Sequence, residues 1–388
     1  MKLTDLKGVK EILKRKDRAQ KRLDALKRFE SRENHDRIHG LGLKTSTSFA
    51  NLNDLEIGFD ELSGSPLDIF ENNKILFYKG QEIYDMDYEG KEKILDTIEK
   101  LEKKDKIDDL HEAVSETLLI YVPKESVFEE VLLKKVLSKN SFSHIIFYFG
   151  QRSKVELMYD VSSEEGDFIG AEIVQIIVDE NSEVFFGLVK DLEKGYYMHN
   201  KNYAYLHDNS TLNLLTADFG GRLIVTETYS KMIGKNSTAN TDNLFYGKNG
   251  EEFDVSGSSI HANKETSSLI SLKGVLEKSK AMTRGLVKIE DNAPESNGYQ
   301  KSDIILLDEE SKAVSIPDLL IHNDQVKCSH GSTISHLEED KIFYLQSRGL
   351  DKLTASKKLV EGFYYPMLEK IKNVSFKEHI QNKIEKRL

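Results

Sequence analysis

The sequence predicts a mainly β protein in which a stack of short strands lies between two helical parts. From about residue 116 to 335, short runs rich in Ile, Val, Phe, Tyr and Leu alternate with Asn, Asp, Gly and Ser, as strands alternate with turns. Helical spacing of apolar residues is almost absent there but recurs on both sides. Strands without intervening helices exclude a doubly wound α/β fold and leave a sandwich, a barrel or a β-solenoid.

The N-terminal part, residues 1–115, is predicted to be helical or mixed. A charged first helix is indicated by apolar residues along one side, namely Ile12, Leu13, Leu23, Leu26 and Phe29. A second helix is indicated by spacings of three and four between Ile94, Leu95, Ile98 and Leu101. Residues 41–87 match neither pattern.

The middle part, residues 116–335, is predicted to contain only strands and turns. The clearest strand runs are Thr117–Val122, His144–Phe149, Glu172–Val178, Val184–Val189 and Gly221–Thr226. Strand-like runs begin at Ser126, Ser153, Ser182 and Ser210, which are spaced by 27, 29 and 28 residues. Similar junctions recur less regularly at Ser237, Ser279 and Ser311. Such periods are typical of stacked repeats, but the periodicity alone leaves a solenoid and a sandwich equally open.

The C-terminal part, residues 336–388, is predicted to be helical again. Ser335 and Glu338 fit a capping box at a helix start, and Gly349 fits the residue just beyond a helix end. One apolar stripe then consists of Ala355, Leu359, Phe363, Met367 and Ile371, and a second of Phe376, Ile380, Ile384 and Leu388. Two such helices pack on the β-body or dock onto a partner, and packing on the body is the commoner case.

Composition narrows the function classes. The net charge of −11 argues against general nucleic-acid binding, which needs cationic side chains to neutralise phosphates. Apolar runs such as Ile173–Val178 are far shorter than a membrane span, and no secretory signal is apparent, so we expect a cytoplasmic protein. The single cysteine excludes an internal disulfide and an all-cysteine metal site within one chain.

One short constellation could carry chemistry. In a strand, Cys328 and His330 point to the same face, and a thiolate beside an imidazole is a soft ligand pair for iron, zinc or copper(I). Lys327 and a protonated His330 would lower the thiol pKa. Two ligands make only half a tetrahedral site, so the rest must come from elsewhere or from another chain. The alternative is that Cys328 is a small buried hydrophobe and His330 a surface residue, which is the commoner case without further context.

Several blocks in fixed order resemble the SufB/SufD family of the SUF iron–sulfur cluster system. The matching blocks are Arg284–Ile289, Gly298–Gln300, Ile304–Leu307, Asp324–Thr333 and Ile342–Gly349. A looser match begins near Asp105, whereas the first hundred residues match poorly. In particular, residues 43–52 lack the Trp-containing stretch of many SufD-like chains.

The resemblance implies a fold and a set of partners. The fold would be a right-handed parallel β-helix between helical ends. SufB and SufD pair through their β-helices, and each binds a SufC ATPase through its C-terminal helices. Nascent clusters are thought to form at the SufB–SufD interface. The implied partner-binding residues here are Ile342, Phe343, Tyr344, Leu345, Arg348 and Gly349. The chain would be a scaffold, not an enzyme, with no tightly bound cofactor and only a transient cluster in the complex.

The details of the resemblance favour the SufD role. SufB-like chains carry a cysteine six residues before a proline, and the position six before Pro317 is Ser311. Gly331 and Ser329 flank His330 where SufB tends to have acidic residues. The resemblance therefore implies His330 as the contribution to a shared interface site and Cys328 as an auxiliary ligand, with the cluster-building cysteine supplied by SufB.

Two other functions remain as alternatives. A homodimer of this chain could replace the SufB–SufD pair, although Ser311 in place of cysteine leaves few thiolates for a stable cluster. A β-helix enzyme acting on polysaccharides would need clustered carboxylates and is usually exported, which the sequence does not support. No phosphate-binding GxxxxGK[ST] motif is present, so any ATPase activity would reside in a partner.

Overall fold

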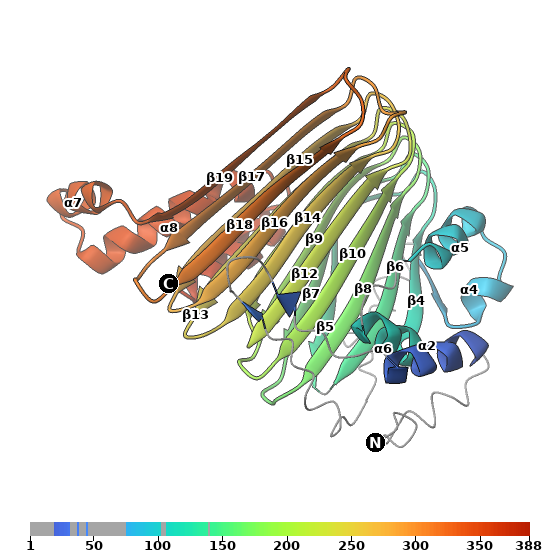
Figure 1. Cartoon of the computed structure of the whole chain (residues 1–388), viewed down its shortest axis with the longest axis horizontal. Coiled ribbons are helices and arrows are strands. Elements are labelled where there is room, and N and C mark those ends of the chain that lie inside the picture. Colours follow the sequence, from blue (N-terminus) through green and yellow to red (C-terminus); the bar gives the residue numbers. More distant parts are fainter. Residues whose placement is uncertain (1–18, 32–36, 39–43, 46–74, 102–105, 139) are drawn as a thin grey trace.

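Sixteen consecutive strands coil into a parallel β-solenoid in the computed structural model, which describes residues 19–31, 37–38, 44–45, 75–101, 106–138 and 140–388. The strands alternate between two sheets that face each other (Figure 1). The mainly β solenoid with helices at both ends, which the resemblance to the family implies, is therefore confirmed.

The even sheet contains β4 (Glu116–Val122), β6 (Ser141–Phe149), β8 (Ile169–Val178), β10 (Tyr197–Leu206), β12 (Leu223–Met232), β14 (Glu252–His261), β16 (Lys280–Ile289) and β18 (Lys312–Ile321). The odd sheet contains β5 (Val127–Leu137), β7 (Lys154–Ser163), β9 (Glu183–Leu192), β11 (Thr211–Gly220), β13 (Thr238–Lys248), β15 (Ser267–Glu277), β17 (Asn297–Leu306) and β19 (Lys327–His336). Within each sheet, neighbours belong to successive coils and pair in parallel. β3 (Leu76–Lys79) adds an antiparallel strand beside β4.

The register explains the period in the sequence. Partners in successive coils lie between 26 residues apart, as for Tyr197 and Leu223, and 32 apart, as for Lys280 and Lys312. Four of the five strands expected from their composition fall within β4, β6, β8 and β9, and the fifth, expected from Gly221, begins two residues later as β12. Each strand alternates inward and outward side chains, and the inward ones form one continuous core between the sheets, here called the lumen.

The serine repeat marks one corner of the solenoid. At the turn from the even to the odd sheet, a residue with positive φ is followed by a buried Ser or Thr in most coils. The pairs are Arg152–Ser153, Asn181–Ser182, Asn209–Ser210, Asn236–Ser237, Glu265–Thr266 and Glu295–Ser296. Ser237 thus continues the regular series, whereas Ser279 and Ser311 lie at the opposite corner. The spacing of the last serines is irregular because Ser279 and Ser311 belong to a different corner of the solenoid from the earlier serines.

Helices cover the first coils of the even sheet. α2 (Ala19–Ser31) packs on α6 (Lys106–Val114), and α4 (Glu82–Asp85) and α5 (Lys91–Glu99) lie beside them (Figure 1). The α5 residues Ile94 and Ile98 pack with Leu119 and Ile146 of the sheet. The predicted second helix is confirmed as α5. Of the predicted first helix, Leu23, Leu26 and Phe29 lie in α2, and Ile12 and Leu13 lie outside the described residues, as do residues 46–74.

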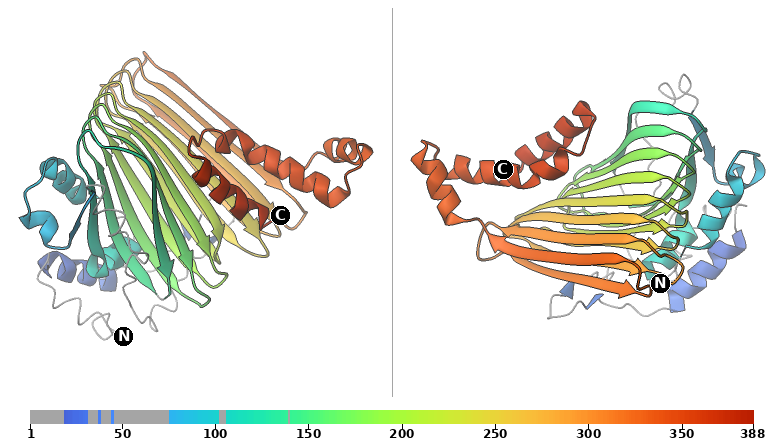
Figure 2. Two further views of the ribbon diagram at one scale, coloured as in Figure 1. Left: turned by 180° about the vertical axis from the view of Figure 1, so that it is seen from behind. Right: turned by 90° about the horizontal axis from the view of Figure 1, so that it is seen from above.

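Two C-terminal helices lie along the outer face of the odd sheet (Figure 2). α8 (Lys352–Leu368) and α9 (Val374–Glu385) bury Tyr364, Phe376 and Ile380 against this face. Their first turns are capped by Asp351 and Asn373, whose side chains accept from backbone N–H groups. Packing on the β-body, which the sequence favours for these helices, is thus what the structure shows.

α7 (Glu339–Ser347) begins later than the capping box predicts. Ser335 is still in β19, and the N-cap residue is Glu338, whose side chain makes no capping hydrogen bond. The expectation of a capping box at Ser335 is wrong because the strand continues to His336 in register with Leu306. Gly349 follows the helix with φ of 96°, as predicted for the residue beyond a helix end.

Candidate functional site

The last coil leaves one end of the solenoid open. β18 and β19 are the final strands of the even and the odd sheet, and within the described ranges neither has a partner on its outer side. Ile321 and Ile334 are 43% and 40% exposed, whereas their register partners one coil earlier, Ile289 and Ile304, are 0% and 1% exposed. The rows of inward-facing side chains that form the core therefore continue into the last coil, but no further coil covers them there.

Cys328 and His330 lie in one of these inward rows. Cys328 pairs in register with Gly298 and packs against the lumen core, and His330 pairs with Gln300. Both side chains therefore point to the same face of β19, as the sequence predicts for residues two apart on a strand. The structure adds that this face belongs to the uncovered last coil. Cys328 is half-buried and His330 is exposed.

The chemistry of the thiol differs from the expectation. Burial raises the pKa of the Cys328 thiol, and the Ser329 N–H opposes this more weakly. The predicted lowering of the pKa by Lys327 and His330 is therefore wrong for the free chain. Lys327 is adjacent on the strand and so points to the opposite face. A thiolate at Cys328 needs a metal or a cationic group brought by another chain.

No third ligand completes the pair from within the described part of the chain, where no group of three His, Cys, Asp or Glu side chains could hold a metal. A further histidine, His261, also lies in the lumen. A Cβ at Gly298 would lie 3.3 Å from His261 Nε2 and 3.5 Å from Cys328 Sγ. The two His261 nitrogens are within 2.8 and 2.9 Å of the Thr266 and Ser268 hydroxyls, and burial lowers its pKa to about 4. His261 is thus a neutral core residue.

Ser311 lies at the corner between β17 and β18. It is 5% exposed, its hydroxyl donates to Asp308 at 3.0 Å, and its backbone N–H also bonds to Asp308. This local turn requires only a small polar side chain. Ser311, the position that the resemblance matches to the SufB cysteine, therefore makes the hydrogen bonds of a local turn.

A second exposed surface lies on α7 and the start of α8, which pack on each other beyond the last coil (Figures 1 and 2). Phe343, Tyr344 and Leu353 are 73%, 56% and 65% exposed. We call these three residues the α7–α8 patch. Arg348 stacks on the Tyr344 ring at 5.3 Å, so it belongs to the same surface.

The other predicted partner-binding residues occupy different places. Ile342 is buried, Leu345 is partly buried, and Gly349 ends the helix with positive φ. They shape α7 and do not enlarge the exposed face. Leu353, Ile321 and Ile334 were not predicted as site residues. Leu353 lies outside the four-residue apolar stripe of α8, and this position in the sequence could have indicated that its side chain is exposed. For Ile321 and Ile334, only the register between coils shows that they are inward residues that no further coil covers.

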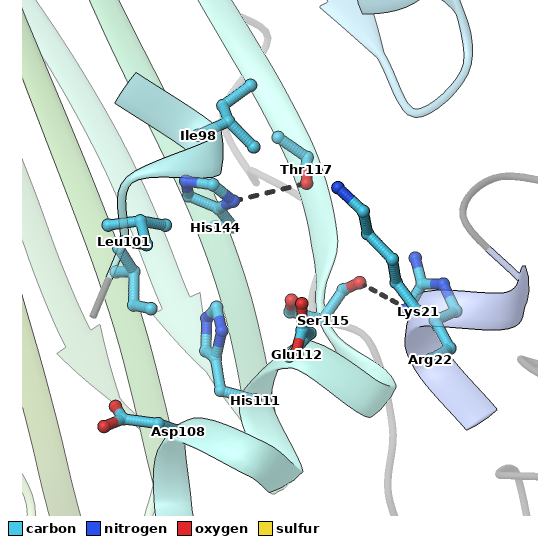
Figure 3. Close-up of a pocket in the computed structure, with 11 residues that line it drawn as sticks. Lys21, Arg22, Ile98, Leu101, Asp108, His111, Glu112, Ser115, Thr117 and His144 are labelled. Carbon is cyan, nitrogen blue, oxygen red and sulfur yellow. Dashed lines mark hydrogen bonds between the residues drawn. The ribbon is translucent and has the colours of Figure 1, made fainter. Parts of the chain in front are cut away.

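A polar pocket between α2, α6 and the even sheet is a competing candidate (Figure 3). His111 Nε2 is 2.7 Å from the Ser143 carbonyl oxygen, and burial lowers its pKa to about 4. His144 lies between Thr117 and Gln175. Arg22 donates to the backbone carbonyl oxygens of Ala113 in α6 and of Ser115 just after the helix. These polar groups hold the helices on the sheet, so the pocket is structural.

Buried charged side chains in the first four coils are paired with opposite charges. Lys190 lies 2.8 Å from Asp218 and 3.0 Å from the Thr226 hydroxyl, and Lys135 lies 3.0 Å from Glu172. All four charged side chains are at most 2% exposed. They are sealed from solvent, and the buried Phe245 is the register partner of Asp218 in the next coil toward the open end. The open last coil remains the candidate site.

Comparison with known proteins gives matches that include the last coil. Residues 133–363 match the family described as SUF system FeS cluster assembly, SufBD core domain. The iron-sulfur cluster assembly protein SufD of Bacillus subtilis is 25% identical over 310 residues, which cover 76% of this chain and 71% of that protein. SufBD family proteins of Staphylococcus epidermidis and Staphylococcus haemolyticus are each 24% identical over 200 residues, covering 51% of this chain and 43% of theirs. None of the described helices is long and apolar enough to span a membrane.

Proposed function

Because this chain belongs to the SufBD core family of SUF iron–sulfur cluster assembly proteins, we propose that it is the SufD-like scaffold subunit of an assembly complex. It would act by binding and positioning, not by catalysis. Its SUF partners would be a SufB-like subunit and a SufC-like ATPase. The similarity to a SufD over three-quarters of the chain supports this role, as does Ser311 at the position of the SufB cysteine.

The open last coil is the surface that would receive the SufB-like subunit. An unpaired strand edge offers a row of N–H and C=O groups that another strand can satisfy. Uncovered inward residues such as Ile321 and Ile334 add apolar area that a second solenoid would bury. This coincidence of free edges and an uncovered core row is the observation that carries the proposal.

The iron–sulfur cluster would be bound transiently at this surface and then passed on. His330 supplies an imidazole nitrogen and Cys328 a sulfur, both suited to iron. Together they provide half of a tetrahedral set, so the partner would supply the remaining ligands, including its cysteine. Holding a cluster with so few ligands on one side favours its release to a recipient, which a scaffold requires.

The α7–α8 patch is the proposed docking surface for the ATPase. Exposed Phe343, Tyr344 and Leu353 form an apolar surface with Arg348 at its rim, the composition that marks protein interfaces. Since α7 contacts α8 and α8 is packed on the solenoid, a movement of the docked ATPase would be transmitted to the β-body.

The function is tested by co-expression with SufB-like and SufC-like subunits from the same genome. We expect the three chains to co-purify and to deliver clusters to an apo-ferredoxin. His330→Ala should leave the complex intact but reduce cluster delivery at least tenfold, and Cys328→Ala should reduce it less. His322→Ala, which removes an exposed histidine outside the inward rows, is the matched control.

Two results would contradict the proposal. Normal cluster delivery by His330→Ala would remove the site assignment. A stable cluster reconstituted from iron and sulfide on this chain alone would show that a homodimer suffices, and the SufD-like role would then be wrong.

A further inference from the structure

The two ends of a parallel solenoid are complementary by construction. Each internal coil pairs in parallel with the coil before it and the coil after it, so the last coil of one copy would match the first coil of another. The inward row that begins at Lys135 in β5, for example, ends at Ile334 in β19. Such a head-to-tail contact does not close, so it would extend into a filament. A chain that offers its last coil to a partner therefore needs a first coil that accepts none.

The core is covered at the first coil, which lies at the opposite end of the solenoid from β18 and β19 (Figure 1). The inward side chains Val131 and Leu133 of β5 are 3% and 1% exposed. Ile75, just before β3, and Phe77 of β3 pack in the same core. The core that is uncovered around Ile334 is thus covered at its other end.

On the even sheet, the edge of the first coil is occupied by β3. This strand has four residues and runs antiparallel to β4, with Leu76 opposite Tyr121 and Lys79 opposite Leu118. The helix α4 then begins at Glu82. A short antiparallel edge strand that ends in an exposed lysine is a poor template for the parallel strand of another coil.

On the odd sheet, the edge of the first coil is β5, which is interrupted by a bulge. Its register with β7 shifts between Phe128 and Val131, where β5 carries an extra residue. The residues at the bulge are Glu129 and Glu130, and both are exposed. Bulges and charged side chains are two of the devices that keep an edge strand from pairing with another chain.

Two further contacts fix this edge. Asn373, the N-cap residue of α9, accepts from the Phe376 N–H and donates from its side-chain nitrogen to the Glu129 carbonyl oxygen at 3.0 Å. A carbonyl of the bulge is thereby taken by the C-terminal part of the chain. Farther along β5, Lys135 points into the core and lies 3.0 Å from Glu172. A charged side chain that points inward also discourages another strand from stacking on an edge.

We propose that the first coil is a protected end, which stops the solenoid from joining head to tail with a second copy. Only the last coil then engages another chain, so assembly stops at a pair of solenoids and does not grow into a filament. This inference goes beyond the proposed function, because it concerns the chain alone and holds whichever partner occupies the last coil.

The test removes the protection of β5 and follows the mass of the isolated chain. The flat-edge variant combines deletion of Glu130 with Glu129→Thr, which removes the bulge and both charges. A second variant, Glu129→Thr with Glu130→Thr, removes the charges but keeps the chain length, so it spares the fold. Each variant is also made with Ile334→Lys, which places a charge on the last coil. Light scattering after gel filtration gives the mass at a series of protein concentrations, and electron microscopy shows the shape.

The mass of the unchanged chain should stay at or below that of a dimer at every concentration. The flat-edge variant should form rods of about ten chains or more, because a head-to-tail contact does not close. The second variant should form the same rods at higher protein concentration, since its bulge remains. Adding Ile334→Lys should return both variants to the mass of a dimer or less.

A folded flat-edge variant with the mass of the unchanged chain would overturn the proposal, as would rods formed by the unchanged chain itself. If circular dichroism shows that the flat-edge variant does not fold, the second variant decides, and an unchanged mass there has the same meaning. Rods that persist with Ile334→Lys would reveal a contact that is not head to tail, and this result also overturns the proposal.

The SufB-like subunit separates this inference from the proposed function. If it binds the last coil, it should stop the growth of the flat-edge rods. Rods that grow unchanged in its presence would contradict its proposed binding at the last coil and would leave the protected first coil in place.

Discussion

The middle of the solenoid and its last coil are built by the same repeat but differ in what covers them. In β9 and β11 every inward side chain is buried, and even a lysine and an aspartate are accommodated there as a sealed pair. In β18 and β19 the same inward rows are half-exposed, and the strand edges are free of partners within the described residues. The difference shows that the last coil is complete in conformation but incomplete in packing.

This comparison separates stability from function. A residue in the middle packs against both neighbouring coils, so its replacement lowers the free energy of unfolding. A residue in the last coil packs against a coil on one side only, so its replacement mainly weakens the binding of the chain that covers it. Cys328 and His330 lie on the incomplete side, where ligand geometry can change when a partner arrives. The predictions below test this contrast.

The largest expected effect comes from the sealed pair in the middle. Lys190→Ala leaves the Asp218 carboxylate buried without its cation, which should lower the free energy of unfolding by about 3–5 kcal/mol. Urea unfolding measures this loss. The exposed pair of Lys264 and Glu265 is the control, and its removal should change stability by about 1 kcal/mol or less. Equal effects at the two sites would contradict the idea of a sealed middle.

Two isoleucines in register give the most direct contrast. Ile304 and Ile334 occupy the same row, at 1% and 40% exposure. Ile304→Ala should lower the free energy of unfolding by about 2–5 kcal/mol because it leaves a cavity, whereas Ile334→Ala should cost about 1 kcal/mol or less in the isolated chain. In binding assays with the SufB-like subunit, Ile334→Ala should be the more harmful of the two. The opposite order would show that the last coil is not the interface.

Stability should also depend on pH through the buried His261. Burial holds its folded-state pKa at about 4, below the ordinary 6.5. Between these values the unfolded chain binds the proton more strongly, so the contribution is present above pH 6.5 and is lost as the pH falls towards 4. For this residue alone, the loss between pH 7 and 5 should be about 2 kcal/mol. Unfolding of His261→Gln should lack this part of the pH dependence, and an unchanged pH profile would contradict a buried neutral histidine.

The smallest effect on stability is expected at the α7–α8 patch. Phe343→Ser and Leu353→Ser alter side chains that are 73% and 65% exposed, so the free energy of unfolding should change by about 0.5 kcal/mol or less. Binding of the SufC-like ATPase, measured by calorimetry, should nevertheless weaken at least tenfold. Retained binding by the double variant would place the ATPase elsewhere.

Much of the fold could be predicted from the sequence, because the patterns that indicate it involve residues close together in the chain. The period of the corner serines, the apolar stripe that begins at Phe376 and the positive φ at Gly349 each follow from a few neighbouring residues. The exposure of Ile334 could not be predicted, because it depends on which residues meet one coil apart. The thiol pKa of Cys328 was predicted in the wrong direction since adjacency in sequence does not imply contact on a strand. The division at residues 115 and 336 and the partner residues of α7 stay predictions.

Hydrogen–deuterium exchange with and without the SufB-like subunit tests the open end most directly. The backbone N–H groups of β18 and β19 that point outward have no partner strand in the free chain as described, so they should exchange quickly. Binding of the SufB-like subunit should slow exchange across residues 312–336 at least tenfold, with little change in β9 and β11. Protection confined to other elements, with exchange in β19 unchanged, would contradict the assignment of the last coil as the shared cluster-assembly surface.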